Sequence, residues 1–599
     1  MQRRWRWIPS DTQAIDQLIR SADISAVVAQ MLLARGVSDP SAISAFLDPK
    51  LTDLRDPELL PGLSTAADKL FASVLAKKSI VIYGDYDADG MTATSILVCC
   101  LRMLNADVSY FVPNRLEDGY GLNSDALRKL AERGKHTVVS VDCGIGSVVE
   151  AELCRELGLE LIITDHHQIG EQLPNAAAIA HPMLPGSSYP FHGLCGAGVA
   201  FKLAWALCQR HSNSSRVTPE LREFLMQAIG LAAIGTIADV VPLLDENRAL
   251  VKHGLISLHK RPCIGLQWLM KVAKITGKSE LSSENVAFGI APRLNAAGRL
   301  GQAQLAVELM TTKDPVRAEA LAVYIDRLNA DRDTLERSVQ LAATKQAKEQ
   351  CDLENDAALV LAGHGWHVGV IGIVAGRLAE KYHLPTIVIA MDPIGKKPAT
   401  GSARSAGCVD LHATLESCRE HLVSFGGHAA AAGLKIEEAN LPLFRQVFCE
   451  AVAEQTGGKL VAPEIVIDAQ TGLDQLDVAT IRQIEQMSPF GAQNHRPILA
   501  ATNVTLAEPP KTMGNGDRHF TGRFAQHGTT LRGVAFGQAE WVVPLTEHRG
   551  PIDIAFRPVI NEFNGMRRVE IQVVDWRVSV AVPTPHVDYQ SRSRMLDAT

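Results

Sequence analysis

The chain has 599 residues, a formal net charge of −7, 46% hydrophobic residues and 21% charged residues. This length predicts several domains, and the composition is ordinary for a soluble globular protein. We expect no membrane span, because no apolar run is long enough, and no secretory signal, because the basic start at residues 1–7 lacks an apolar stretch. The 11 cysteines follow no CxxC or regular spacing, which predicts free thiols and a cytoplasmic protein.

The first half of the chain is predicted to hold helices and parallel strands. Residues 1–60 form a helical segment that ends in a turn. Residues 61–314 alternate short β-branched runs with helical patterns, which is typical of a parallel α/β domain. Residues 315–350 form one long connecting helix, because the stretch has no glycine and no proline after Pro315.

The second half is predicted to hold two smaller domains and a tail. Residues 351–456 form a second α/β unit, with strands at Ala357–Leu361 and Thr386–Ala390. Residues 457–578 carry short alternating runs separated by glycine and asparagine turns, which predicts a small antiparallel β-barrel. Residues 579–599 are polar and predicted to be flexible. The fold class is therefore a multidomain α/β protein.

Four acidic clusters mark the first α/β domain, and the first three directly follow apolar runs. Their residues are Asp85, Asp87 and Asp89 in the first cluster, Asp142 in the second, Asp165, His166 and His167 in the third, and Asp239 in the fourth. Because ligands bind beyond the carboxyl ends of strands in open parallel sheets, we expect these side chains to converge. Carboxylates that lie close together need cations, and oxygen ligands with an imidazole suit Mg²⁺ or Mn²⁺. The pattern predicts a site with two metal ions that cleaves phosphoesters.

The order and spacing of these clusters resemble the four motifs of the DHH phosphoesterase superfamily. Other stretches are similar to the RecJ family of bacterial single-strand-specific exonucleases: residues 113–122, 291–300, 426–433 and 561–565. The resemblance runs from about residue 30 to residue 578. It implies a DHH catalytic domain at 61–314, a DHHA1 domain at 351–456 and a DNA-binding OB-fold at 457–578.

The resemblance also implies an activity. Relatives of this type degrade single-stranded DNA from 5′ to 3′ into mononucleotides with Mn²⁺ or Mg²⁺. The roles of such relatives imply that this protein takes part in DNA recombination and repair, together with a single-strand-binding protein and a helicase. Nothing in the sequence indicates a dimer, and we expect a monomer.

Family roles transfer to individual residues of this chain. Asp142 is expected to bridge two metals, with Asp87 on one metal and with Asp89, His166 and Asp239 on the other. His167 is expected to face the scissile phosphate, and Asp165 to orient a ligating imidazole. Asp85 either ligates a metal or only hydrogen-bonds. Many superfamily members carry histidine where this chain has Tyr83, which leaves the first metal short of one protein ligand.

A second set of residues is expected to hold phosphate. By resemblance, Arg115, Arg299, Ser402, Arg404 and His428 bind the 5′-terminal phosphate or the nearby backbone. Such a pocket would make the enzyme an exonuclease. In the barrel, arginines alternate with phenylalanines such as Phe520, Phe524, Phe536 and Phe563, a composition that suits single strands.

Two other functions remain open at this point. One is a phosphodiesterase of the same superfamily that acts on short oligonucleotides or cyclic dinucleotides, although such relatives usually lack the C-terminal barrel. The other is a replication scaffold that has lost catalysis, although every matched acidic and histidine position is intact here.

Overall fold

The computed structural model describes residues 3–9, 11–115, 119, 121–353, 355–407, 409–458, 464–563 and 566–579. Its chain forms two compact units: Met1–Lys50, Pro463–Phe490 and Asn494–Thr599 make one, and Leu51–Ala462 with Gly491–Gln493 make the other. The predicted tail beyond residue 579, residues 564–565, and residues 116–118 and 120 of one family-like stretch lie outside the described residues.

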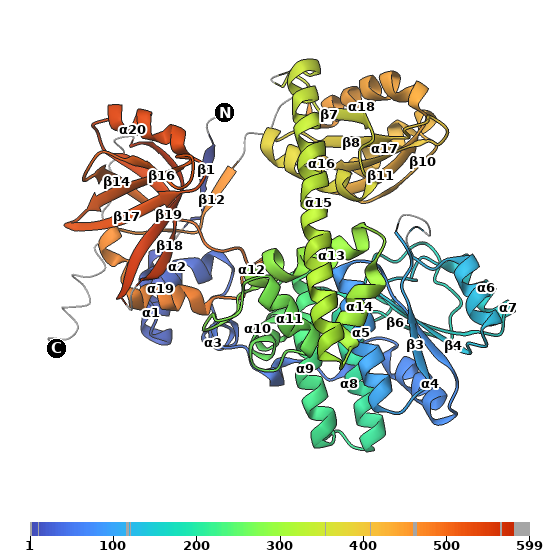
Figure 1. Ribbon diagram of the computed structural model, residues 1–599. Helices are drawn as coiled ribbons and strands as arrows, with labels where there is room; N and C mark the ends of the chain where they lie inside the picture. The colour runs from blue at the N-terminus through green and yellow to red at the C-terminus, as the bar shows by residue number, and fades with distance from the viewer. Residues whose placement is uncertain are drawn as a thin grey trace. The chain divides into compact units, whose positions relative to one another are not determined.

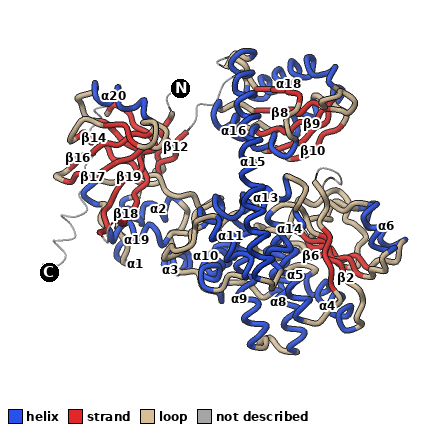
Figure 2. Tube along the Cα trace, in the orientation of Figure 1, coloured by secondary structure: helices blue, strands red, loops and turns tan. Residues whose placement is uncertain are grey.

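The larger unit begins with a five-stranded parallel sheet (Figures 1 and 2). Its order is β3 (Val108–Phe111), β2 (Ile80–Tyr83), β4 (Thr137–Val141), β5 (Glu160–Thr164) and β6 (Ala178–Ala180). All residues of β2 and β4 are buried, which explains their unbroken apolar runs. The chain runs from β2 to its neighbour β3 and then crosses to β4 on the other side of β2, so the crevice beyond β2 and β4 is the expected ligand site.

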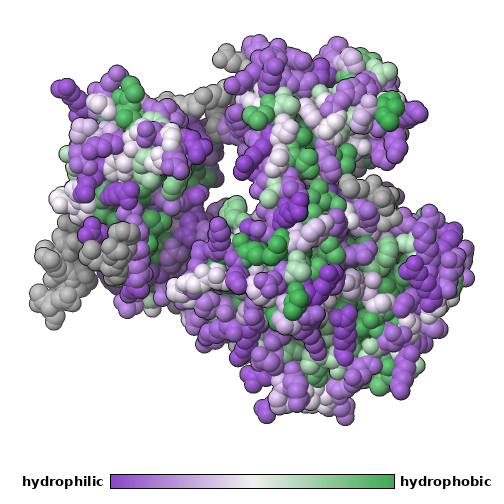
Figure 3. Space-filling model, viewed as in Figure 1, coloured by the Kyte–Doolittle hydropathy of each residue, from purple (hydrophilic) through white to green (hydrophobic). Residues whose placement is uncertain are grey.

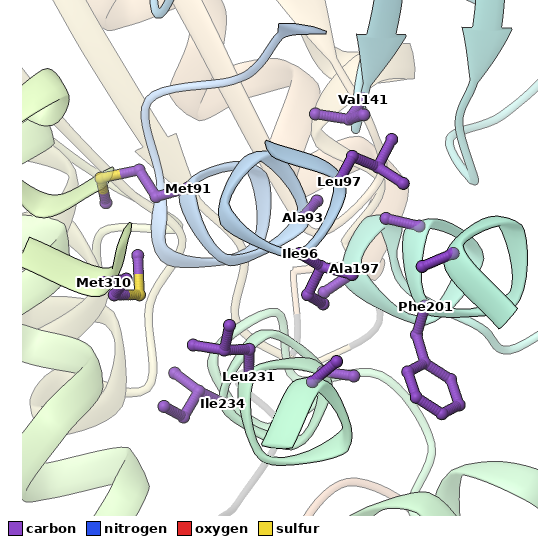
Figure 4. Close-up of a cluster of buried hydrophobic side chains, with 14 of the residues drawn as sticks. Met91, Ala93, Ile96, Leu97, Val141, Ala197, Phe201, Leu231, Ile234 and Met310 are labelled. Atoms are coloured by element: carbon purple, nitrogen blue, oxygen red, sulfur yellow. The ribbon is translucent and has the colours of Figure 1, made fainter. Parts of the chain in front are cut away.

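Helices surround this sheet and form most of the same lobe. They are α4 (Leu63–Leu75), α5 (Ala88–Met103), α6 (Ser124–Glu132), α7 (Val148–Glu156), α8 (Gly196–Ser212), α9 (Pro219–Ala238), α10 (Asp245–Lys260), α11 (Ile264–Val272), α12 (Ser283–Asn285), the π-helix η3 (Val286–Ile290), α13 (Ala291–Arg299) and α14 (Ala303–Thr311). Helices α5, α8 and α9 pack together through Leu97, Ala197, Phe201 and Leu231, among others (Figure 4). This core fixes the N-termini of α5 and α8.

Helix α9 qualifies the expectation that no segment could span a membrane. It is long and apolar enough to do so, but 72% of its apolar window is buried inside the protein. A helix that is hydrophobic on all sides fits this position in the core. The face seen in Figure 3 is mostly hydrophilic, with smaller hydrophobic patches.

Helix α15 (Pro315–Gln350) leads from this lobe to a second one, as the sequence predicts. Asp314 caps its start, with a side-chain oxygen accepting the amide of Val316. The second sheet has the order β10 (Ser424–Gly427), β11 (Ala431–Ile436), β9 (Ala399–Arg404), β8 (Thr386–Met391) and β7 (Leu359–His364). Its helices are α16 (Val368–Tyr382), α17 (Leu411–Ser417) and α18 (Leu441–Thr456).

The smaller unit is built around a seven-stranded sheet in the order β13 (Ala469–Gln470), β14 (Leu499–Leu506), β18 (Ile552–Phe563), β19 (Met566–Val578), β17 (Thr529–Ala535), β16 (His519–Gln526) and β15 (Lys511–Met513). An additional pairing of β14 with β16 closes the sheet into a barrel. Its helices are α1 (Thr12–Ala22), α2 (Ala26–Ala34), α3 (Pro40–Leu47), α19 (Val478–Gln486) and α20 (Val542–Glu547).

The N-terminal segment differs from the helical prediction for residues 1–60. Strand β1 (Arg4–Trp7) pairs in parallel with β12 (Glu464–Ile467), and residues up to Lys50 belong to the barrel unit. The fold class is confirmed: a parallel-sheet lobe, a connecting helix, a second α/β lobe and a C-terminal barrel.

Candidate metal centre and phosphate pocket

The acidic and histidine residues predicted from the sequence converge at one edge of the first sheet. Asp85, Asp87 and Asp89 follow β2, Asp142 follows β4, and the Asp165–His167 segment follows β5. Asp239 comes from the C-terminal end of α9. The convergence results from parallel pairing, which brings the carboxyl ends of β2, β4 and β5 to the same edge.

His166 lies among three carboxylates. Its Nε2 atom is 3.1 Å from Asp142 Oδ1, 3.6 Å from Asp239 Oδ2 and 3.8 Å from Asp89 Oδ2. Among the described residues, three groups have ligand atoms within 4.8 Å of one another and could each hold an ion: Asp85–Asp87–Asp142, Asp89–His166–Asp239 and Asp142–His166–His167. Asp142 and His166 each belong to two of these groups, so the groups overlap in one cluster.

Backbone conformation and a glycine place Asp142. Its φ angle is 62°, the left-handed region, which a non-glycine residue adopts only when its surroundings compensate. A Cβ on Gly196 would lie 2.5 Å from Asp142 Cβ and 2.6 Å from its Oδ1. Only glycine at 196 therefore leaves room for this carboxylate.

Asp89 is held by the N-terminus of α8. Its two oxygens accept the amides of Gly196 at 2.7 Å and Ala197 at 2.8 Å. A Cβ on Gly235 would lie 2.4 Å from Asp89 Oδ1. We did not single out these three residues from the sequence, although the Gly196-Ala197-Gly198 run before an apolar stretch was a visible signal of a close backbone approach.

Asp87 caps the helix that carries Asp89. Its Oδ1 accepts the amides of Asp89 at 2.9 Å and Gly90 at 3.0 Å at the start of α5. Asn295 Oδ1 accepts the amide of Ala88 at 2.8 Å, so α13 also holds this turn. Asn295 lies in the family-like stretch 291–300, and the sequence alone indicates no role for it.

Asp165 organises the loop after β5. Its Oδ1 accepts the amide of His166 at 2.7 Å and lies 2.7 Å from His167 Nδ1. Burial alone would raise the pKa of Asp165, but the hydrogen bond and charge of His167 lower it to about 2. Burial opposes the charge on His167, yet Asp165 raises the pKa of His167 to about 9. The imidazole next to Asp165 is thus that of His167, and the side chain of His166 points at the carboxylates.

The electrostatics of the cluster call for cations. Burial, followed by the neighbouring carboxylates, raises the pKa of Asp142 and Asp85 well above the usual range and raises that of Asp239 to about 8. Asp85 Oδ1, Asp142 Oδ1 and His166 Nε2 are buried without a hydrogen-bond partner among the described residues. Unpartnered carboxylate oxygens and an imidazole nitrogen are ligands for Mn²⁺ or Mg²⁺, so this donor set fits such ions.

Predicted phosphate-binding residues form a cationic cluster in the same unit. Burial, then the charges of Arg115 and two further arginines including Arg404, lowers the pKa of Arg299 to about 10. Arg299 donates to Gly369 O at 3.1 Å in the first turn of α16, and Arg404 donates to Ser402 Oγ at 3.1 Å. Like charges held together beside a helix N-terminus are suited to an anion.

The other predicted phosphate residues are more peripheral. Arg115 is exposed, and its Cζ lies 5.0 Å from the centre of the Tyr86 ring. His428 is exposed at the tip of the β10–β11 hairpin, beside the end of β9, where Ala431 pairs with Arg404. Tyr83 stands in the position where many superfamily members have histidine, and its hydroxyl donates to Gly121 O at 3.2 Å.

Models of three protein families match the chain. They are the DHH family, N-terminal domain, at residues 79–229, the DHHA1 domain at 355–454 and the RecJ OB domain at 467–575. The first covers the parallel sheet and the acidic and histidine residues from Asp85 to His167 but ends before Asp239, the second covers β7–β11, and the third covers most of the barrel strands.

Whole proteins also match. The chain is 36% identical over 579 residues to the single-stranded-DNA-specific exonuclease RecJ of Bacillus subtilis, covering 96% of this chain and 71% of that protein. It is similar to the crystal structure of RecJ in complex with Mn²⁺ from Thermus thermophilus, with TM-score 0.81, 31% identity and coverage of 99% and 83%. A structure of the same protein with Mg²⁺ matches with TM-score 0.75, 30% identity and coverage of 99% and 82%.

Proposed function

Because the chain belongs to the RecJ family of single-stranded-DNA-specific exonucleases, we propose that it degrades single-stranded DNA to mononucleotides from the 5′ end with Mn²⁺ or Mg²⁺. The observation that carries the proposal is the presence of two groups in one unit. These are the acidic cluster around His166 and the arginine cluster around Arg299.

The residues that would hold two ions follow from the three groups. Asp85, Asp87 and Asp142 would hold one ion, and Asp89, His166 and Asp239 the other. Asp142 would be shared between them, since its Oδ1 lies 3.1 Å from His166 Nε2. When bound, such ions stabilise the charge on the reacting phosphate and lower the pKa of water. Asp165 contacts Nδ1 of His167 and keeps the imidazole protonated at neutral pH, so the Nε2–H group would donate to a phosphate oxygen.

The arginine cluster sets the mode of cleavage. Arg299, Arg404 and Ser402 would take the 5′-terminal phosphate at the start of α16, with Arg115 and His428 at the rim. A guanidinium binds two phosphate oxygens at once, which fixes the end of the strand. A fixed end beside the metal centre gives cleavage one nucleotide at a time.

The barrel would guide the rest of the strand along one outward surface. We define the basic face as Lys511, Arg523, Arg532, Arg557 and Arg568. Cross-strand registers place these residues on adjacent rows: Lys511 pairs with Thr521, Arg523 with Arg532 and Arg568 with Asn561. Glu570 forms an ion pair with Arg532 at 3.1 Å and leaves the face basic overall. Basic grooves with aromatic platforms bind single strands.

Phe536 is an exposed aromatic side chain in the barrel unit. Phe520 and Phe524 are fully buried, as expected of a core pattern, whereas Phe536 is 62% exposed. The ring of Phe536 meets that of His519 edge-on at 5.4 Å. The side chain of Phe563 lies outside the described residues.

The phosphodiesterase for short oligonucleotides or cyclic dinucleotides is not favoured. Residues 467–575 match the RecJ OB domain, which a small substrate does not require. The scaffold without catalysis is disfavoured because all predicted ligands converge. We further propose, from family membership, a cytoplasmic monomer that acts beside a single-strand-binding protein and a repair helicase.

The test is cleavage of 5′-phosphorylated single-stranded DNA with Mn²⁺ by the wild type and Asp142→Asn. We expect Asp142→Asn to bind DNA and release no mononucleotide, while the matched control Asp331→Asn, at an exposed position of α15, keeps full activity. Cleavage by Asp142→Asn at the wild-type rate would refute the metal assignment. Wild-type activity restricted to dinucleotides would favour the small-substrate alternative.

A further inference from the structure

We infer that Asn247, a buried residue of α10, positions two elements of the metal centre relative to each other. The inference rests on the proposed function in one respect, namely that the acidic cluster binds metal ions. Asn247 does not belong to any candidate ligand group and is not among the phosphate-binding residues. It acts through backbone, so it is a positioning residue.

One amide group of Asn247 links two loops. Its Nδ2 donates to Gly193 O at 2.5 Å and to Pro242 O at 3.0 Å. Gly193 lies three residues before Gly196, whose amide holds Asp89, and Pro242 lies three residues after Asp239. The two hydrogens of this nitrogen therefore connect the loop that precedes Gly196, which holds Asp89, to the loop that follows Asp239.

The chemistry of the side chain supports this role. Two carbonyl oxygens need two donors, and an asparagine amide supplies both from one nitrogen. Its Oδ1 is buried without a hydrogen-bond partner among the described residues. A buried oxygen without a hydrogen-bond partner lowers the stability of the fold. The contribution of Asn247 to stability alone therefore does not explain why a side-chain amide occupies this position.

The neighbouring residue anchors the same turn of α10. Glu246 accepts Lys202 Nζ of α8 at 2.6 Å and the amide of Arg55 at 2.9 Å, and it also bonds the hydroxyl of Tyr189. The side chains of Lys202 and Glu246 are 2% and 0% exposed. The first turn of α10 is thus fixed to the helix whose N-terminus holds Asp89.

The consequence concerns one candidate ion site. Asp89 and Asp239 belong to the same group, with His166. Their separation decides whether both carboxylates reach one ion. The loss of a group that orients a metal ligand without binding the metal itself typically lowers metal affinity or activity about 10- to 100-fold.

The experiment compares two isosteric variants of the full chain. Asn247→Asp removes both donors and places a carboxylate against two carbonyls. Asn494→Asp is a matched control in the barrel unit, because Asn494 is also fully buried and donates to Met487 O at 2.9 Å and Pro489 O at 2.8 Å. Asn247→Ala, which adds no charge, serves as the second variant if Asn247→Asp does not fold.

The readouts are Mn²⁺ binding by electron paramagnetic resonance, kcat, KM for single-stranded DNA, and Tm. For Asn247→Asp we expect Mn²⁺ affinity and kcat to fall about 10- to 100-fold, with KM within about twofold of wild type. For Asn494→Asp we expect a lower Tm with Mn²⁺ binding unchanged.

Several results would overturn the inference. In one, Asn247 variants lower Tm but keep wild-type Mn²⁺ affinity and kcat. In another, no Asn247 variant folds, which shows a structural role alone. A wild type that binds Mn²⁺ but does not degrade single-stranded DNA would refute the proposed activity and leave the Mn²⁺ titration as a test of Asn247. A wild type that binds no Mn²⁺ would overturn both.

Discussion

Replacing Gly196 with alanine tests whether the backbone of α8 shapes the metal centre. The added Cβ would lie 2.5 Å from Asp142 Cβ and 2.6 Å from its Oδ1, whereas ordinary contact begins at 3.4 Å, so the whole side chain must retreat by about 0.8–0.9 Å. Asp142 is 2% exposed and belongs to two candidate ion groups, so it cannot retreat without changing both.

Gly196→Ala is expected to weaken both folding and Mn²⁺ binding. Overpacking costs about 1–3 kcal/mol, and alanine in place of glycine in a helix returns at most about 1 kcal/mol. We therefore expect a net loss of stability of about 1–2 kcal/mol. We expect Mn²⁺ affinity, measured by calorimetric titration, to fall by at least about tenfold.

Gly198→Ala is the control on the same helix. Its Cβ would lie 3.3 Å from the tip of Leu194, a flexible side chain that can yield. It should bind Mn²⁺ as the wild type does. Wild-type Mn²⁺ affinity in Gly196→Ala, or an equal loss in Gly198→Ala, would refute the reasoning.

Three further predictions concern pH, strain and the barrel. The pKa of Asp239 in the metal-free protein is about 8, above the value of about 3.9 for an unfolded chain, so the carboxyl is mostly protonated at pH 7. Mn²⁺ binding should then release at least one proton and strengthen from pH 6 to pH 8. Calorimetry in buffers of different ionisation enthalpy would contradict this if it showed no proton release. Val240 has a φ of 59° and is 70% exposed, so Val240→Asn should stabilise the protein by about 1 kcal/mol in thermal melts, and a lower Tm would contradict this. Phe536→Ala should weaken single-stranded DNA binding by about 1–3 kcal/mol in fluorescence anisotropy, whereas the exposed control Val543→Ala should not, and equal effects would remove the stacking role.

The convergence of the acidic residues was predictable because it depends on local patterns. Short apolar runs predict parallel strands, and parallel strands bring their carboxyl ends to one edge. Asp142 and the Asp165–His167 segment follow directly from this rule. The prediction of the long helix α15 also depends on a local pattern, because its 36 residues contain no interior glycine or proline.

Other features depend on segments that are distant in the chain. The donors to Asp89 come from Gly196 and Ala197, more than 100 residues away in the sequence, and strand β1 pairs with β12 near residue 464. The hydrophobic pattern of neither segment indicates which distant segment it contacts. The pairing of Asp165 with His167 was missed for a different reason: two adjacent histidines compete for one carboxylate, and only their side-chain directions decide between them.

The most direct test of the account uses two single-stranded DNAs, one labelled at each end, with purified protein and Mn²⁺. A chelator and a duplex of the same sequence serve as controls. The account predicts that mononucleotides appear first from the 5′ label, that the 3′ label is released last, and that chelation stops both. Release from the 3′ end first, internal cleavage, or equal degradation of the duplex would contradict it.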